Sequence, residues 1–170
     1  MQDSTFRLLF IGDVIGEAGR AAVRMLVPDL RRELNLDAVI ANGENSPSGG
    51  EGHNAGDWLG VALDNRLPDS RQSRVRCRRG RNVSGTGAAN NTTGKSGGGL
   101  ARVRLRVVNV QGRVFMRHTP RSPFLWVERA VDKLEAAGAD LLLVDVHAKA
   151  TSEKQAIGYH LTGRAQAVVV

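Results

Sequence analysis

The first forty-five residues predict a strand, a helix and a second strand. "FRLLFIG" (residues 6–12) is a short apolar run that ends in Gly, as buried parallel strands often do. "DAVIANGEN" (residues 37–45) contains a second apolar run, which we expect to be a buried strand over residues 38–41. A strand–helix–strand unit of this kind predicts a parallel pair of strands joined by a right-handed crossover.

The predicted helix follows a Gly-punctuated loop. Its apolar residues recur at helical spacing, and they are Val23, Leu26, Val27 and Leu30. Pro28 lies inside this pattern, and proline lacks the N–H that an α-helix needs. We therefore expect a break or kink near residue 27.

The last third of the chain repeats the alternation of strands and helices. Strands are predicted for "LRVVNVQG", "DLLLVDVHA" and "AQAVVV", and helices for "PFLWVERAVDKLEAAG", which Gly138 would close, and "TSEKQAIGYHL". Phe124 and Trp126 are expected to pack in the core. The two regions together predict an α/β protein in which helices flank a layered sheet.

Residues 52–102 differ from both regions. Gly, Ser, Arg and Asn dominate there, and no period of 2 or 3.6 is visible. Residues 66–106 hold eleven Lys or Arg and one acid, Asp69, which leaves 13 of the 24 basic and 16 of the 17 acidic residues elsewhere. The chain is thus a mildly acidic protein that contains a strongly basic insert, and so long a stretch without periodicity is unusual in a compact domain.

Length and composition narrow the classes of protein. A chain of 170 residues has room for one domain with a core. Its single cysteine, Cys77, excludes an internal disulfide and a cysteine-based zinc cluster. There is no apolar run of membrane-spanning length and no secretory signal pattern, so we expect a cytoplasmic protein with no membrane partner.

Polar side chains follow several predicted strands. Asp13 follows the first strand, Glu44 and Asn45 follow the second, His147 ends "LLLVDVH" and Asn109 ends "RVVN". In open parallel sheets, ligands gather at the carboxyl ends of strands. Carboxylate, amide and imidazole groups there would suit a divalent metal site. Each residue also has a structural interpretation, as a helix cap, a turn residue or a hydrogen-bonded histidine.

Four segments carry a resemblance to a known family. "LLFIGDVIGEAGR", "DAVIANGENSPSGGEG", "VVNVQGRVFM" and "LLLVDVHAKATSEKQAIGYHLTGRAQAVV" together resemble the YmdB-like family of calcineurin-type metallophosphoesterases, over about residues 6–52 and 103–169. The resemblance implies a bacterial cytoplasmic phosphodiesterase that acts on cyclic nucleotides through two divalent metal ions, iron or manganese. It assigns the metal ligands to Asp13, Glu44, Asn45 and His147, and it implies a small-molecule phosphodiester substrate.

The chain departs from the family pattern at two places. The family has a central Gly-Asn-His motif, in which Asn binds metal and His donates a proton, and no such motif occurs here. The family also continues after "AVV" with Gly-Thr-His-Thr-His, whereas this sequence ends at Val170. We therefore expect a truncated single domain over residues 1–170 with impaired or no activity, and we assign no catalytic residue.

A shifted reading frame would explain the missing motif. With suitable codons for residues 71–77, the loss of one base turns "RQSRVRC" into Gly-Asn-His-Val-Tyr-Asp. The same shift turns "NTTGKSG" (residues 91–97) into Ile-Pro-Pro-Gly-Asn-Pro-Gly, and the family has a Pro-Pro-Gly-x-Pro-Gly segment near that place. The hypothesis is that residues 53–102 are a frame-shifted, poorly ordered segment.

Two sequence features point to other functions. "ANNTTGKS" (residues 89–96) fits the loose phosphate-loop pattern, but the flanking sequence is a poor strand before it and a poor helix after it. The arginines of residues 71–81 could bind nucleic acid, although they lack aromatic neighbours and a recognisable reading helix. A nucleic-acid binder and a non-functional remnant remain as alternatives to the enzyme. The sequence leaves open whether the chain forms a homo-oligomer.

Overall fold

The computed structural model describes residues 5–43, 61–63, 89–94, 103–116 and 122–170. The chain divides into two compact units. The first comprises Met1–Arg79 and Thr93–Val103, and the second comprises Gly80–Thr92 and Arg104–Val170.

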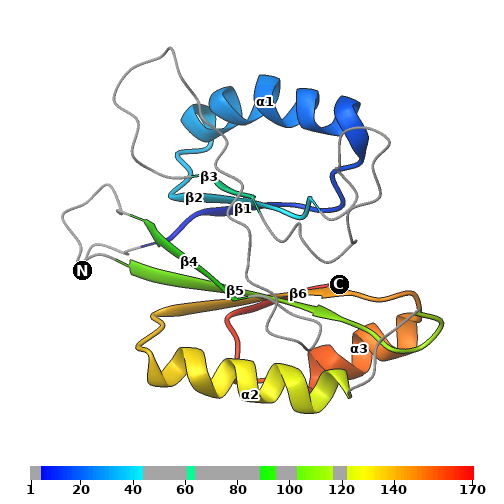
Figure 1. Cartoon of the computed structure of the whole chain (residues 1–170). Coiled ribbons are helices and arrows are strands. Elements are labelled where there is room, and N and C mark those ends of the chain that lie inside the picture. Colours follow the sequence, from blue (N-terminus) through cyan, green and yellow to red (C-terminus); the bar gives the residue numbers. More distant parts are fainter. Residues whose placement is uncertain (1–4, 44–60, 64–88, 95–102, 117–121) are drawn as a thin grey trace. The chain divides into compact units, whose positions relative to one another are not determined.

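In the part of the first unit that the structure describes, there are a three-stranded sheet and one helix (Figure 1). Its elements are β1 (Leu8–Ile11), α1 (Gly16–Glu33), β2 (Ala38–Ala41) and β3 (Val61–Leu63). β1 and β2 are parallel, with Leu8 opposite Ala38, as the strand–helix–strand pattern predicts. All four residues of β2 are buried, which confirms the prediction from its apolar run. β3 pairs with β2 in the antiparallel direction.

Helix α1 continues through Pro28, so the predicted break near residue 27 is wrong. Proline removes one backbone donor, and the helix can resume beyond it when its flanking turns are intact. The apolar stripe is also less buried than its spacing suggests. Val27 is buried, but Leu26 is 58% exposed.

The second unit contains a four-stranded sheet in the order β4-β5-β6-β7, with two helices against it (Figure 1). Its elements are β4 (Ala89–Gly94), β5 (Val103–Gln111), α2 (Pro123–Ala136), β6 (Leu141–His147), α3 (Thr151–His160) and β7 (Ala167–Val169). β5, β6 and β7 are parallel neighbours. From β5 onward, every element coincides with one that the hydrophobic pattern predicts.

The core of the second unit explains this agreement. Side chains alternate across a strand, so every second residue of β5 and β6 faces the helices. Those residues are buried with apolar residues of α2 and α3 in one cluster, which includes Val108, Val110, Val144, Val146, Val127, Val131, Ile157 and Leu161. Phe124 and Trp126 pack against this cluster, as predicted. Burial of each such side chain stabilises the fold by about 1.5–3 kcal/mol.

Two of the three parallel strand pairs, β1–β2 and β5–β6, start with the same pair of hydrogen bonds. The Asp37 N–H donates to the Arg7 carbonyl (2.8 Å), while the Arg7 N–H donates to the Asp37 carboxylate (2.8 Å). In the second unit, Asp140 and Arg104 exchange the equivalent bonds, at 3.0 and 2.7 Å. An Asp before the second strand of each pair therefore fixes the register of both strands.

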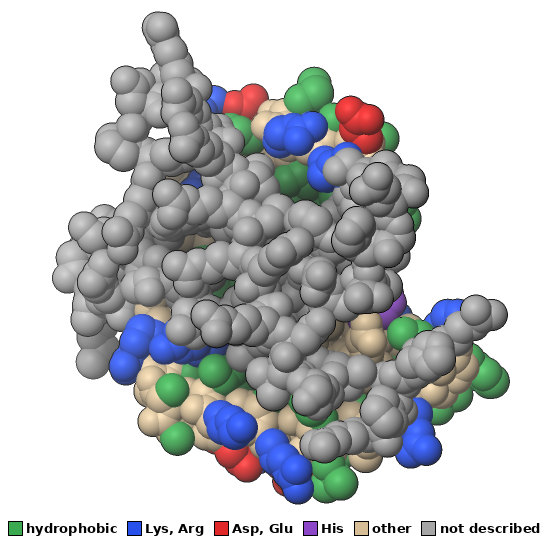
Figure 2. Space-filling view, viewed as in Figure 1, with side chains coloured by type: hydrophobic (Ala, Val, Ile, Leu, Met, Phe, Trp, Pro, Cys, Tyr) green, Lys and Arg blue, Asp and Glu red, His purple; other side chains and the backbone are tan. Residues whose placement is uncertain are grey.

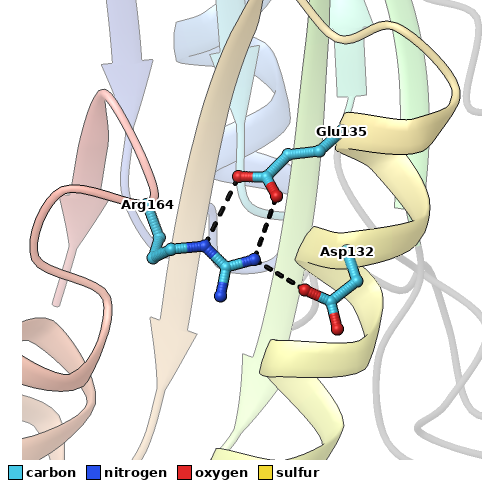
Figure 3. A network of polar contacts seen from close by, with 3 residues as sticks. All are labelled: Asp132, Glu135 and Arg164. Atoms are coloured by element: carbon cyan, nitrogen blue, oxygen red, sulfur yellow. Dashed lines mark hydrogen bonds and ion pairs between the residues drawn. The ribbon is translucent and has the colours of Figure 1, made fainter.

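Charged side chains reinforce the outside of the second unit. Arg164, beyond α3, contacts two acids on α2: its guanidinium lies 2.6 Å from Asp132 and 2.9 Å from Glu135 (Figure 3). These contacts raise the pKa of Arg164 further above its usual range, so the group stays charged. Elsewhere on the surface, charged and apolar side chains lie side by side (Figure 2).

Strands β3 and β4 lie within residues 53–102, where the sequence shows no strand period. β4 occupies the first six residues of the segment that matches the phosphate-loop pattern. A phosphate loop needs a turn between a strand and a helix at that point, and an extended strand there does not provide one. Residues 95–102, the arginine-rich residues 71–81, Cys77 and the histidines His53 and His118 lie outside the described residues.

Candidate metal centre

Asp13 lies in the turn between β1 and α1, at the carboxyl end of β1. Its side chain is exposed, and its backbone adopts a φ of +42°, which L-residues rarely adopt. Two backbone hydrogen bonds surround this turn: the Val14 N–H donates to the Asn42 carbonyl, and the Asn42 N–H donates to the Ile11 carbonyl, both at 2.8 Å. The strained conformation of Asp13 is thus held in place by the neighbouring strand end.

The same bonds join the Asp13 turn to the segment that leads to Glu44 and Asn45. Asn42 and Gly43 are buried at the end of β2, and Glu44 and Asn45 follow directly in the sequence. Both of these predicted ligands lie outside the described residues. The structure therefore shows the turn that contains Asp13 and the two residues, Asn42 and Gly43, that precede Glu44 in the sequence.

His147 is the last residue of β6 and is half-buried, as predicted from the sequence. It lies opposite Gln111, the last residue of β5. The Gly112 N–H donates a 2.8 Å hydrogen bond to the carbonyl oxygen of His147. A backbone bond between two strand ends therefore fixes the main chain of this histidine, as the bond between Asn42 and Ile11 does in the first unit.

Glu153 is a residue of this region that the sequence patterns did not reveal. It lies in the first turn of α3 and is 7% exposed. Its carboxylate accepts backbone hydrogen bonds from Arg113 (2.8 Å) and Val114 (3.1 Å), in the loop that follows β5. Acids are common in the first turn of a helix because of the helix dipole, so nothing in the sequence marked this one as buried.

Asn109 lies elsewhere than the sequence predicted. It is two residues inside β5, not at the strand end, and it is 5% exposed. Its side-chain amide donates to the carboxylate of Asp145 on the neighbouring strand (2.8 Å), and its Oδ1 has no hydrogen-bond partner among the described residues. The "VVNVQG" run continues the strand past this residue, so Asn109 is a buried sheet residue with a polar neighbour.

The chemistry of the described donors suits a divalent cation. Asp13 offers a carboxylate and His147 an imidazole, which are ligands that manganese, iron and zinc accept. Asp13 belongs to the first unit and His147 to the second. Within the described residues, no group of three or more His, Cys, Asp or Glu side chains is close enough to hold a metal ion. Two of the four predicted ligands therefore occupy the strand ends at which they were expected.

Comparison with models of protein families shows to which family the chain belongs. The model of the family described as "YmdB-like protein" matches residues 9–57 and 79–170, well over half of the chain. The chain belongs to the YmdB-like family. This confirms the resemblance carried by the strand-end segments. The match leaves out residues 58–78, which include the arginine-rich stretch at residues 71–77.

A curated relative of this YmdB-like chain has a named activity. The chain is 33% identical over 189 residues to the 2',3'-cyclic-nucleotide 2'-phosphodiesterase of Bacillus subtilis (strain 168). The alignment covers 96% of this chain and 65% of the relative. The chain thus spans slightly less than two thirds of the length of that enzyme.

Solved structures agree with the fold. A crystal structure of a hypothetical protein from Thermus thermophilus is 33% identical, with a TM-score of 0.61, covering 96% of this chain and 66% of that one. A structure described as a novel phosphatase from Mycoplasma pneumoniae is 21% identical, with a TM-score of 0.59, covering 97% of this chain and 64% of that one. The second likeness concerns the fold alone. Together they confirm the predicted α/β class.

No helix among the described residues is long and apolar enough to cross a membrane.

Proposed function

We propose that this chain is a metal-dependent phosphodiesterase that hydrolyses phosphodiester bonds of nucleotides, including cyclic ones, through a dinuclear metal centre. Membership of the YmdB-like family carries this proposal. The name of the Bacillus relative supports the substrate class. A cytoplasmic location and a small-molecule substrate belong to the same proposal.

The proposed ligands are Asp13, Glu44, Asn45 and His147. When bound, a pair of divalent ions about 3.5–4 Å apart would activate water and neutralise charge on the phosphoryl group. The chain's own contribution is to hold its donors at strand ends. The left-handed turn at Asp13 presents a carboxylate beyond β1, and the end of β6 presents the imidazole of His147.

We also propose that part of residues 53–102 is read in a shifted frame within one metallophosphoesterase domain, residues 1–170. The family match is interrupted at residues 58–78, and the arginine-rich stretch in which a one-base shift restores Gly-Asn-His lies inside that gap. The match resumes at residue 79 and covers residues 91–97, so the interruption supports a shift at residues 71–77 but not at residues 91–97. The coding DNA around the codons for residues 71–77 decides the matter, because a gene in which no one-base shift restores Gly-Asn-His would exclude the idea.

Metal binding to the 170-residue chain tests the proposed function. Calorimetric titration with Mn²⁺ should give a measurable affinity that Asp13→Ala and His147→Ala each weaken at least tenfold. His160→Ala is a matched control, because His160 is exposed and its ring contacts Phe124 in the second unit. Equal affinities in all four proteins, or no binding in any of them, would contradict the proposed ligands.

The nucleic-acid alternative gives a different result in a second experiment. Binding of the chain to DNA of unrelated sequence that weakens steeply with salt would favour a role for the arginines of residues 71–81. Absence of both metal binding and DNA binding would favour a non-functional remnant. The metal-dependent enzyme predicts Mn²⁺ binding and no salt-dependent DNA binding.

A further inference from the structure

Three described features of the second unit meet beside His147. The His147 carbonyl accepts from the Gly112 N–H, and the next two residues of that loop, Arg113 and Val114, donate their N–H groups to Glu153. Glu153 in turn lies in the first turn of α3, the helix that follows β6. The buried carboxylate of Glu153 thus accepts hydrogen bonds from the loop after β5. The first residue of this loop, Gly112, is itself hydrogen-bonded to His147.

Gly112 packs tightly against both Glu153 and the residue that follows His147. A Cβ added to Gly112 would overlap both the Glu153 carboxylate and the Ala148 side chain. Ala148 is the residue that follows His147 in the sequence. Glu153 and Ala148 therefore both pack against Gly112 where a larger residue would place its Cβ, so this contact requires glycine at residue 112.

Burying the carboxylate of Glu153 costs free energy, so its hydrogen bonds must offset that cost. A buried carboxylate is tolerated when it is hydrogen-bonded, and two backbone N–H donors provide those bonds. Apolar residues at this position of α3 would avoid the cost but would leave the N–H groups of Arg113 and Val114 without their acceptor. The role of Glu153 is therefore to order residues 112–114.

We propose that Glu153 is a positioning residue for His147: it orders the Gly112–Val114 loop, and Gly112 in turn fixes the end of β6. The imidazole of His147 would bind a divalent metal ion from this position. The metal-binding part of this inference rests on the proposed function. The positioning itself concerns residues 112–114, 147 and 153 and is measurable in the metal-free chain.

The first test uses the metal-free protein. Glu153→Gln keeps the size of the side chain but replaces one acceptor oxygen by an NH₂ group that cannot accept from a backbone N–H. Amide hydrogen exchange by NMR should show at least tenfold faster exchange at Gly112, Arg113 and Val114, while Val108 and Val144 within the sheet keep their protection. The imidazole resonances of His147 should shift, and those of the exposed His160 should not.

Two further variants separate positioning from loss of stability. Gly112→Ala would place a Cβ against both Glu153 and Ala148 and should also shift the His147 resonances. Glu33→Gln, at the exposed end of α1, removes the same charge and should leave them unchanged. If Glu153→Gln frees the loop amides but the His147 resonances stay in place, Glu153 is a structural residue of the loop and the inference is wrong.

The second test is metal affinity at a temperature at which all variants are folded. Glu153→Gln should weaken Mn²⁺ binding about tenfold, the effect typical of residues that orient metal ligands. An unchanged affinity in Glu153→Gln, with wild-type binding intact, would overturn the link between positioning and metal. If the wild-type chain binds no Mn²⁺, the proposed function fails, and the His147 resonances of the metal-free variants still decide whether Glu153 positions this residue.

Discussion

The Val14 N–H donates a 2.8 Å hydrogen bond to the carbonyl oxygen of Asn42, directly beside the left-handed residue Asp13. This bond fixes the turn after β1 against the end of β2, so Asp13 keeps an unfavourable backbone conformation. Such strain is found at functional sites when the surrounding structure over-determines it. The energetic consequence can be measured by changing the side chain and the backbone freedom separately.

We predict that Asp13→Gly and Asp13→Ala lose metal binding alike but differ in stability. Glycine adopts positive φ without a steric penalty, whereas alanine does not. The free energy of unfolding should therefore be about 1 kcal/mol higher for Asp13→Gly than for Asp13→Ala. Urea denaturation of both variants measures the difference. Equal stabilities would mean that Asp13 relaxes to a negative φ in solution.

Ile157 provides a test of the core of the second unit. Its side chain is fully buried in the cluster between α2, α3 and the sheet. Ile157→Ala should lower the free energy of unfolding by about 2–5 kcal/mol, because it removes buried methyl groups and leaves a cavity. Far-UV circular dichroism, which reports the loss of α2 and α3, follows the transition.

The matched control for this variant is Leu125→Ala, on the outer face of α2. Leu125 is 57% exposed, so truncation should change the free energy of unfolding by less than about 0.5 kcal/mol. A loss at Leu125 as large as that at Ile157 would show that another part of the protein covers this face of α2 in solution.

Sequence patterns predicted the second unit better than the first. β5 and β6 contain nearly continuous apolar runs, which are typical of parallel strands buried on both faces. The helices that follow them have their own apolar faces, so local pattern and tertiary packing agree. Helix α1 is different, because Leu26 fits its apolar stripe and is nevertheless 58% exposed. Short strands such as β3, with three residues, carry too little sequence to show a period.

The sequence predicted some residues of the candidate site and missed others. The placement of Asp13 and His147 at strand ends follows from the position of the apolar runs, because a run that ends marks where a strand ends. The role of Glu153 does not follow from any run, since its burial depends on a loop some forty residues earlier in the chain. Long-range hydrogen bonds of this kind leave no local pattern. Asn109 was misplaced for a different reason, because β5 continues beyond it to Gln111.

The pairing of Asp140 with Arg104 predicts a pH dependence. Hydrogen bonds from the Arg104 side chain and backbone lower the pKa of Asp140. A carboxyl group whose pKa is lower in the folded state stabilises the fold above its unfolded pKa, about 3.9, and that contribution is lost as pH falls through the folded value. Wild type should therefore melt at a higher temperature than Asp140→Asn at pH 6.

Acidification should narrow this difference. As pH falls below about 3.9, the carboxylate of the wild type is progressively protonated, and the melting temperatures of the two proteins should converge. Thermal unfolding followed by circular dichroism between pH 6 and pH 2.5 provides the measurement. A difference that stays constant over this range would mean that the Asp140 side chain contributes by its shape and not by its charge.

Catalytic turnover should depend on the motif that the chain lacks. The resemblance to the YmdB-like family assigns one metal ligand and the proton donor to a Gly-Asn-His motif, which does not occur in this sequence. Because a missing general acid costs roughly 10²–10⁴ in rate, the 170-residue chain should show no hydrolysis of bis-p-nitrophenyl phosphate with manganese or iron. Measurable hydrolysis that Asp13→Ala abolishes would show that the motif is dispensable.

The complementary experiment replaces residues 71–77 by the frame-restored sequence Gly-Asn-His-Val-Tyr-Asp. This replacement should tighten Mn²⁺ binding because it restores an amide ligand. A scrambled replacement of the same composition should leave Mn²⁺ binding unchanged.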